Sequence, residues 1–96
     1  MGTLDSLRNM RNEILAAATQ HGAKNVRVFG SVARGSETAE SDIDLLVDFD
    51  PERSLYDLVG LKLDIESLLG RRADVVTESS LSTYLRERIL AEARPL

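Results

Sequence analysis

The sequence predicts a small α/β (α+β) domain in which helices cover one face of a short sheet. Two observations lead to this fold class. Helix-like and strand-like segments alternate along the chain, in the order helix, strand, short turn, strand, helix, strand, helix, which is typical of a layered α/β protein. The chain has 96 residues and contains neither a linker-like stretch nor an internal repeat. We therefore expect a single domain over residues 1–96.

Three segments carry the signals of helices. In the first, apolar residues recur at helical spacing and the pattern ends at Gly22. In the second, Ser54 and Asp57 form an imperfect capping box. The third cannot continue through Pro95, because proline lacks the amide proton that a helix interior needs. The expected helices cover residues 4–21, 54–69 and 82–93.

Three shorter segments are rich in β-branched residues or alternate apolar with polar residues, as strands do. Gly30 ends the first of them, and residues 31–34 can form one helical turn before Gly35. Pro51 closes the second. The expected strands cover residues 25–29, 41–49 and 72–77.

Composition excludes several classes of protein. The chain has no cysteine, which rules out a disulfide scaffold, a zinc-thiolate site and cysteine chemistry. Twelve basic residues against sixteen acidic ones give a net charge of −4, so broad nucleic-acid binding, which needs a basic face, is not expected. No apolar run is long enough to span a membrane, and the first residues lack the apolar core of a signal peptide. We expect a cytoplasmic protein that binds neither membranes nor nucleic acid directly.

Half of the acidic residues lie between Glu37 and Asp57. Within this stretch the alternation of residues 41–49 turns Asp42 and Asp44 together onto the face opposite the apolar one. Two carboxylates this close repel each other, and a hard divalent cation such as Mg²⁺ removes the repulsion. The alternative is an Asp-x-Asp pair that is merely solvated. The residues expected on the buried face are Ile43, Leu45, Val47 and Phe49.

Gly30 and Ser31 stand between a strand and a helical turn. The free amide groups of such a turn can bind an anion, and the Ser31 hydroxyl can donate to a phosphate oxygen. An ordinary turn is the alternative. The segment is not a P-loop, because no lysine follows Gly35.

Asp74 adds a third carboxylate on the last expected strand. If this strand lies beside residues 41–49, Asp74 can join Asp42 and Asp44 at a two-metal site, where it would ligate an ion and draw a proton from an attacking hydroxyl. Otherwise Asp74 is a surface acid on an edge strand.

Together these motifs resemble the minimal nucleotidyltransferases of the DNA polymerase beta-like superfamily. That family's pattern is Gly-Ser, a short spacer, Asp-x-Asp on a strand and a third Asp on a later strand. The matching segment here reads GSVARGSETAESDIDLLVDF, with ADVV downstream. The resemblance covers nearly the whole chain and implies a small nucleotidyltransferase fold, with a short mixed sheet of three or more strands and helices packed on one face. The matching residues are Gly30, Ser31, Ala33, Arg34, Gly35, Asp42, Asp44 and Asp74.

The resemblance also implies a function. Stand-alone proteins of this size are similar to the antitoxins of HEPN/MNT toxin–antitoxin pairs, which transfer AMP from ATP to a tyrosine of the HEPN ribonuclease toxin and so silence it. The chain lacks the R-x(4–6)-H signature of the toxin, as expected for the other partner, and would form a hetero-oligomer with it. By this resemblance Asp42, Asp44 and Asp74 are catalytic and hold two Mg²⁺ ions. The implied ATP-binding residues are Gly30, Ser31, Arg34 and Gly35.

Two other functions stay open. A small-molecule (aminoglycoside-type) nucleotidyltransferase would use the same site on a different acceptor, although such enzymes usually carry an extra domain to hold that acceptor. A non-catalytic antitoxin would act by binding alone, with a vestigial site. The intact carboxylates argue against the second of these.

Several charged residues have a structural alternative to a functional role. Arg34 can contact a phosphate or pair with Glu37 or Glu40 in its own loop. Lys62 is expected to pair with Glu66, four residues on, rather than to bind phosphate. Capping or surface roles are expected for His21, Arg71 and Arg72.

Overall fold

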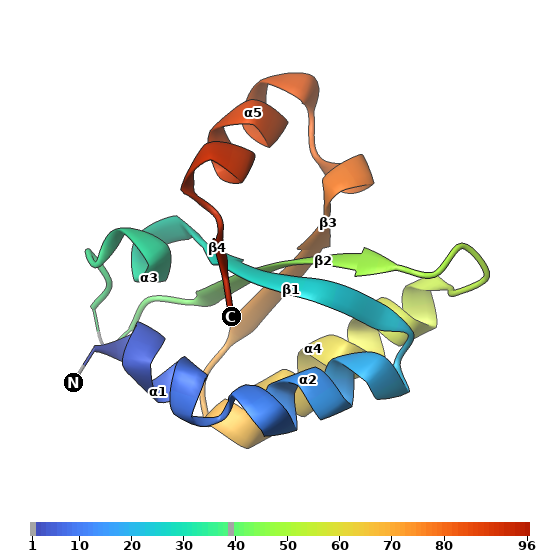
Figure 1. Ribbon diagram of the computed structural model, residues 1–96, viewed down its shortest axis with the longest axis horizontal. Coiled ribbons are helices and arrows are strands. Elements are labelled where there is room, and N and C mark those ends of the chain that lie inside the picture. The colour runs from blue at the N-terminus through green and yellow to red at the C-terminus, as the bar shows by residue number, and fades with distance from the viewer. Residues whose placement is uncertain (1, 39) are drawn as a thin grey trace.

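A four-stranded mixed sheet organises the computed structural model, which describes residues 2–38 and 40–96. Its strands are β1 (Ala23–Phe29), β2 (Ile43–Phe49), β3 (Ala73–Thr77) and β4 (Arg94–Pro95). They lie in the order β3-β2-β1-β4 (Figure 1). β1 runs antiparallel to β2 and β4, whereas β2 and β3 are parallel.

The helices follow the predicted order. They are α1 (Thr3–Asn9), α2 (Arg11–Gln20), α3 (Gly30–Arg34), α4 (Leu55–Leu69) and α5 (Thr83–Glu92), with a short 3-10 helix at Glu78–Ser80. The α+β class with a short mixed sheet is confirmed.

The single helix expected over residues 4–21 is divided at Met10, where the backbone leaves the helical region (φ −102°, ψ 17°). Leu7 and Ile14, on either side of this break, are both fully buried, so the buried face of the predicted helix is preserved.

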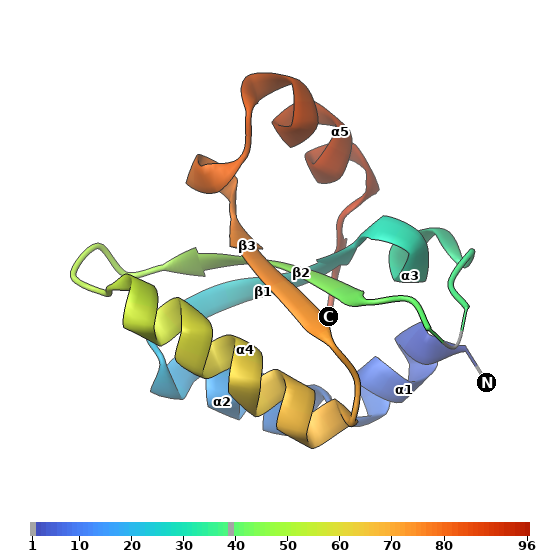
Figure 2. The same ribbon diagram turned by 180° about the vertical axis from the view of Figure 1, so that it is seen from behind.

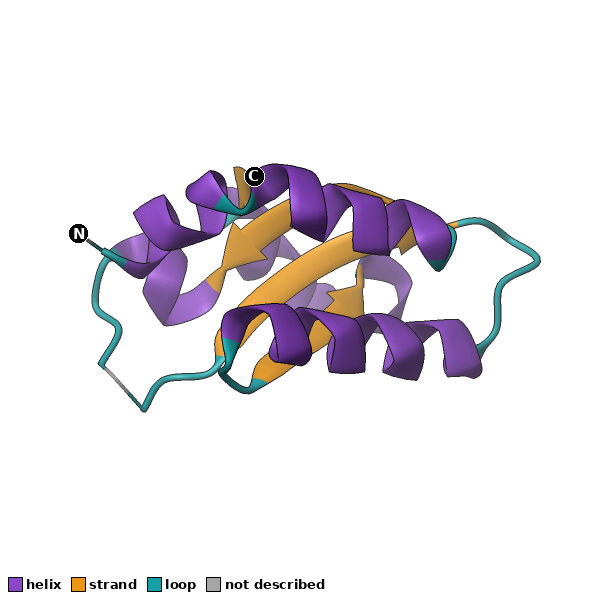
Figure 3. Cartoon of the chain, turned by 90° about the horizontal axis from the view of Figure 1, so that it is seen from below, coloured by secondary structure: helices purple, strands orange, loops and turns teal. Residues whose placement is uncertain are grey.

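Helices lie on both sides of the sheet (Figures 1 and 2). α1, α2 and α4 cover one face, as expected, and Figure 3 shows α2 and α4 side by side across it. α5 lies on the opposite side, which the expectation of helices on one face did not include. Leu46 of β2, on the same face as Asp44, is fully buried, so this face also needs an apolar cover. Ile89 is the buried residue of α5 on that side.

The hydrophobic core lies between the sheet and the first group of helices. In β2 the predicted alternation is confirmed: Ile43, Leu45 and Val47 are buried, and Phe49 packs against the core as a partly buried side chain. Other large core residues are Leu7, Ile14, Val28, Val32, Leu61 and Ile65. Because this face is fixed by packing, the polar residues of β2 are held on the opposite face.

The last residues add a short edge strand to the sheet, which the sequence analysis did not predict. The last helix ends before Pro95, as expected, but Arg94 and Pro95 then pair with β1 as β4, with Arg94 opposite Val28. Leu96 continues this contact by donating its amide hydrogen to the Val26 carbonyl at 3.2 Å. Among the described residues, no helix is long and apolar enough to cross a membrane.

Candidate active site

Two of the predicted carboxylates meet where β2 and β3 run side by side. Asp44 is the register partner of Asp74 across this parallel pair, so the two residues lie on adjacent strands, roughly 5 Å apart in the hydrogen-bonding direction. β3 therefore does lie beside β2, as the prediction for Asp74 required. On its other side Asp44 is paired with Phe29, the last residue of β1.

The environment of Asp44 is strongly acidic. Burial of its carboxyl, together with the negative charges of Asp74 and Asp42, raises the pKa of Asp44 to about 6, against an opposing effect of Arg34. A group of carboxylates that disfavours its own ionisation is stabilised by a cation, and an all-oxygen donor set suits Mg²⁺. The residues therefore fit a magnesium ion by their chemistry.

Asp42 is turned toward Arg72. Its Oδ1 atom lies 3.3 Å from the Arg72 Nε atom, and the Arg72 side chain is 81% exposed. With Asp42 in this orientation, no three acidic, histidine or cysteine side chains among the described residues lie close enough together to hold a metal ion. The guanidinium of Arg72 is the cation that Asp42 contacts here.

Gly30 brings the start of α3 against Asp44. Its backbone has a φ of +73°, and a Cβ atom at this position would overlap the Asp44 Oδ2 atom. Glycine is therefore favoured both by the backbone conformation and by the close approach to the carboxylate. Ser31 follows it and is partly exposed. The predicted turn and Asp44 therefore lie against each other.

Glu92 is a site residue that the sequence analysis missed. The Gly30 amide donates to its Oε1 atom at 3.0 Å, and Arg34 donates to its Oε2 atom at 2.9 Å. Arg34 therefore pairs with the end of α5 and not with Glu37 or Glu40. Glu92 lies 58 to 62 residues from its partners in sequence, so no local pattern predicts the contact. The one signal was an acidic residue in the last turn of a helix, where the helix dipole disfavours negative charge.

Gly35 ends α3 in the left-handed conformation, with a φ of +74°. A Cβ atom there would meet nothing within 4 Å. The structure thus gives Gly35 a capping role, and its part in nucleotide binding stays a prediction.

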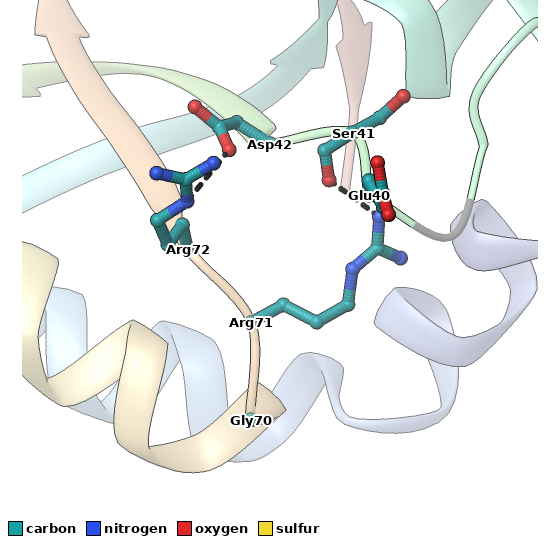
Figure 4. A pocket seen from close by; sticks show the side chains of 6 residues that line it. All are labelled: Glu40, Ser41, Asp42, Gly70, Arg71 and Arg72. Carbon is teal, nitrogen blue, oxygen red and sulfur yellow. Dashed lines mark hydrogen bonds and ion pairs between the residues drawn. The ribbon is translucent and has the colours of Figure 1, made fainter.

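A pocket of about 320 Å³ opens beside Asp42. Arg71 and Arg72 form part of its wall, and Figure 4 shows them reaching from one segment toward the loop before β2. Arg71 donates to the Ser41 carbonyl at 2.6 Å and to the Thr3 hydroxyl at 3.0 Å, so it ties that loop to α1. The full lining is Glu40, Ser41, Asp42, Gly70, Arg71 and Arg72.

Lys62 and Glu66 hold the strand that carries Asp74. The predicted pair between them is confirmed at 3.1 Å. Lys62 also donates to the Ala73 carbonyl at 2.6 Å, and the Ala73 amide donates to Glu66 at 2.9 Å. The pair thus satisfies the outward-facing backbone groups of Ala73 on an edge strand. Ala73 directly precedes Asp74.

His21 also has a structural role. Its Nε2 atom lies 2.7 Å from Asp64 Oδ2, and its ring packs so close to Gly60 that a Cβ atom there would contact the ring at 2.7 Å. The residue joins the end of α2 to α4, on the side of the sheet away from the candidate site.

Comparison with known proteins decides the family. A family profile described as "Nucleotidyltransferase domain" matches residues 9–96. The chain belongs to this family. A solved structure of a "putative minimal nucleotidyltransferase" is 51% identical to this nucleotidyltransferase, has a TM-score of 0.88 and is matched over 97% of its own chain and 100% of this one. The predictions of a nucleotidyltransferase fold and of an enzyme are confirmed.

Two further proteins are similar at the level of sequence and fold. The protein adenylyltransferase MntA of Thermococcus cleftensis is 41% identical over 71 residues, which are 74% of this chain and 72% of that one. A crystal structure of a mutant form of the toxin-antitoxin MntA-HpeT contains a chain that is 25% identical, with a TM-score of 0.73; the match covers 90% of this chain and 70% of that one.

Proposed function

We propose that this nucleotidyltransferase is the antitoxin of a toxin–antitoxin pair and transfers AMP from ATP to a hydroxyl group of its partner. The observation that carries the proposal is the register of Asp44 with Asp74, with Gly30 packed against Asp44. This arrangement brings carboxylates and the turn at Gly30 together, and a metal-bound triphosphate would need both groups. The similarity to an adenylyltransferase and to a toxin-antitoxin chain supports AMP as the group and a protein as the acceptor.

The three carboxylates have distinct parts in this proposal. Asp42, Asp44 and Asp74 would hold two Mg²⁺ ions, which requires Asp42 to turn away from Arg72. When bound, these ions supply positive charge that neutralises the phosphates and makes the acceptor hydroxyl more acidic. Asp74 lies on its own strand and would take the proton of that hydroxyl.

The nucleotide is held from the other side of the site. Gly30 and Ser31 offer a backbone amide and a hydroxyl to phosphate oxygens, and Arg34 offers a guanidinium. In the reaction the acceptor oxygen forms a bond to the α-phosphorus of ATP. The bond from that phosphorus to the bridging oxygen breaks, pyrophosphate leaves with the electron pair, and the acceptor proton passes to Asp74.

The resemblance to the minimal nucleotidyltransferases suggests a more specific partner and acceptor residue. The partner would be a HEPN-type ribonuclease toxin and the acceptor one of its tyrosines, modified in the cytoplasm where ATP is available. Attachment of AMP adds a phosphodiester charge and a nucleoside to the toxin surface, and the modified toxin would be inactive.

The test is transfer of label from α-³²P-ATP to the protein encoded beside this chain, with and without Mg²⁺. We expect labelling of that protein with Mg²⁺ and none in EDTA. Asp42→Ala should lose the labelling yet keep its cooperative thermal transition, because its side chain lies outside the core and is 39% exposed. Unlabelled partner in the presence of Mg²⁺, or equal labelling by Asp42→Ala, would overturn the proposal.

A further inference from the structure

The carboxylate of Glu92 already occupies the donors that the proposed function assigns to a phosphate. Its two oxygens accept hydrogen bonds from the Gly30 amide at 3.0 Å and from Arg34 at 2.9 Å. The side chain is only 20% exposed. A backbone amide and a guanidinium converging on two oxygens of one anion is also how proteins hold a phosphoryl group.

Glu92 comes to this position from the far end of the chain. It is the last residue of α5, on the side of the sheet opposite α2 and α4 (Figure 2). Two residues later Arg94 pairs with Val28 of β1, which fixes the end of α5 near the start of α3. The contact is therefore set by the sheet.

The charge of Glu92 is maintained in this position. Although burial opposes its ionisation, the hydrogen bonds from Arg34 and from the Gly30 amide lower the pKa of Glu92. Its negative charge in turn contributes to the raised pKa of Asp44. Glu92 thus adds a further negative charge to a site that already contains the carboxylates of Asp44, Asp74 and Asp42.

We propose that Glu92 is a carboxylate plug, which a nucleoside triphosphate must displace from Gly30 and Arg34 to bind. The inference rests on the proposed function, since it concerns the same site. The Gly30 amide has one proton to donate, so it cannot serve Glu92 and a phosphate fully at once. A ligand with several phosphates can replace the lost contacts, whereas adenosine cannot.

The plug can leave at low cost. Ile89 is the one buried residue of α5, and the large side chains of Tyr84, Leu85 and Leu90 are exposed. Few packing contacts therefore hold the helix in place, and local movement of such an element is cheap compared with unfolding. Because Arg94 stays paired with Val28, displacement of Glu92 would move its side chain and the last turn of α5 and leave the sheet in place.

The affinity for inorganic tripolyphosphate in the presence of Mg²⁺ tests the proposal by calorimetry. Glu92→Gln removes the charge at nearly constant size, and Glu87→Gln, an exposed position on the same helix, is the control with the same change in net charge. We expect Glu92→Gln to bind tripolyphosphate roughly tenfold more tightly than wild type, because a charge-assisted contact no longer competes. Glu87→Gln should match wild type.

An unchanged or weaker affinity of Glu92→Gln would overturn the plug; weaker binding would mean that Glu92 holds Arg34 in place for the ligand. A second measurement needs no variant. In wild type, Mg²⁺-tripolyphosphate should shift the NMR signals of the Gly30 amide and of the Glu92 carboxyl carbon, and binding without a shift at Glu92 would also overturn it.

Failure of the proposed function gives a different result. If Glu92→Gln tightens tripolyphosphate binding but no variant labels a partner with AMP, the plug stands and the adenylylation does not. If labelling occurs and Glu92→Gln binds tripolyphosphate as wild type does, the proposed adenylylation stands and the plug does not.

Discussion

Asp44 faces Asp74 directly across the parallel pair of β2 and β3. Neither residue has a basic partner among the ion pairs of the described residues, although Arg34 lies close enough to offset part of the charge on Asp44. Two neighbouring carboxylates in this arrangement are costly for a fold unless a cation joins them. Ionisation of this pair is therefore expected to lower the stability of the fold when no cation is bound.

Gly30 and Gly35 allow a matched test of the close approach to Asp44. Both have a positive φ, but a Cβ atom would overlap Asp44 only at Gly30. Gly35→Ala should lower stability by about 1 kcal/mol, the usual cost of alanine in the left-handed region, and should lower AMP transfer less than Gly30→Ala does. Gly30→Ala should lose transfer and be less stable than Gly35→Ala. Thermal unfolding and the labelling assay measure both, and equal transfer by the two variants would show that the Gly30 contact is not needed.

Asp74→Asn should separate nucleotide binding from transfer. Because Asp74 lies on a separate strand from Asp42 and Asp44, its loss should leave most of the affinity for Mg²⁺-ATP. Transfer of AMP should fall by roughly 10²–10⁴-fold if Asp74 acts as the general base. Calorimetry and labelling on the same preparation decide this. Transfer within a few-fold of wild type would return Asp74 to the role of a surface acid.

The raised pKa of Asp44 predicts how stability depends on pH. Its pKa is about 6 in the folded protein, against an ordinary value of 3.8 that represents the unfolded chain. Between these values the folded state therefore binds the proton more strongly than the unfolded state. Stability should therefore fall as the pH rises through this window. In EDTA, Asp44→Asn should melt a few degrees above wild type at pH 7.5 and close to it at pH 3.5, since about 1 kcal/mol shifts the Tm by about 4–8 °C in a domain of this size.

Added Mg²⁺ supplies the control for this prediction. At pH 7.5 it should raise the melting temperature of wild type more than that of Asp44→Asn, because only wild type keeps the full set of carboxylates. A wild-type melting temperature that rises relative to Asp44→Asn between pH 4 and pH 6 would contradict the sign of the effect.

Glu66 predicts the opposite dependence on pH. The hydrogen bond from the Ala73 amide, followed by that from Lys62, lowers the pKa of Glu66 below its ordinary 4.5. Its contribution to stability is therefore present above about pH 4.5 and is lost as the pH falls through the folded pKa. Glu66→Gln should melt below wild type at pH 7 and approach it in acid, whereas Glu52→Gln, at an exposed position, should match wild type throughout. A constant difference at all pH values would mean that charge is not the cause.

Much of the candidate site could be predicted from local pattern. The alternation of apolar and polar residues in β2 is enough to place Asp42 and Asp44 on one face, because one face of a packed sheet must be apolar. A glycine after a strand indicated the sharp turn at Gly30. The turn at Gly30 and the position of Asp44 opposite the buried face are as predicted, since they depend on residues adjacent in sequence, whereas Asp42, directly before β2, contacts Arg72.

The neighbours of those residues were decided by the tertiary structure alone. The pairing of Asp74 with Asp44 depends on which strand lies beside β2, and the contact of Glu92 with Gly30 depends on the side of the sheet to which α5 returns. Lys62 was predicted to meet Glu66, one helical turn away, but not to hold the backbone of Ala73. Sequence alone determined which side chains leave the core, because burial follows a short repeat. The sheet order and the packing of α5 determined which of them meet, because contacts between residues 30 to 62 positions apart form only when the whole domain packs.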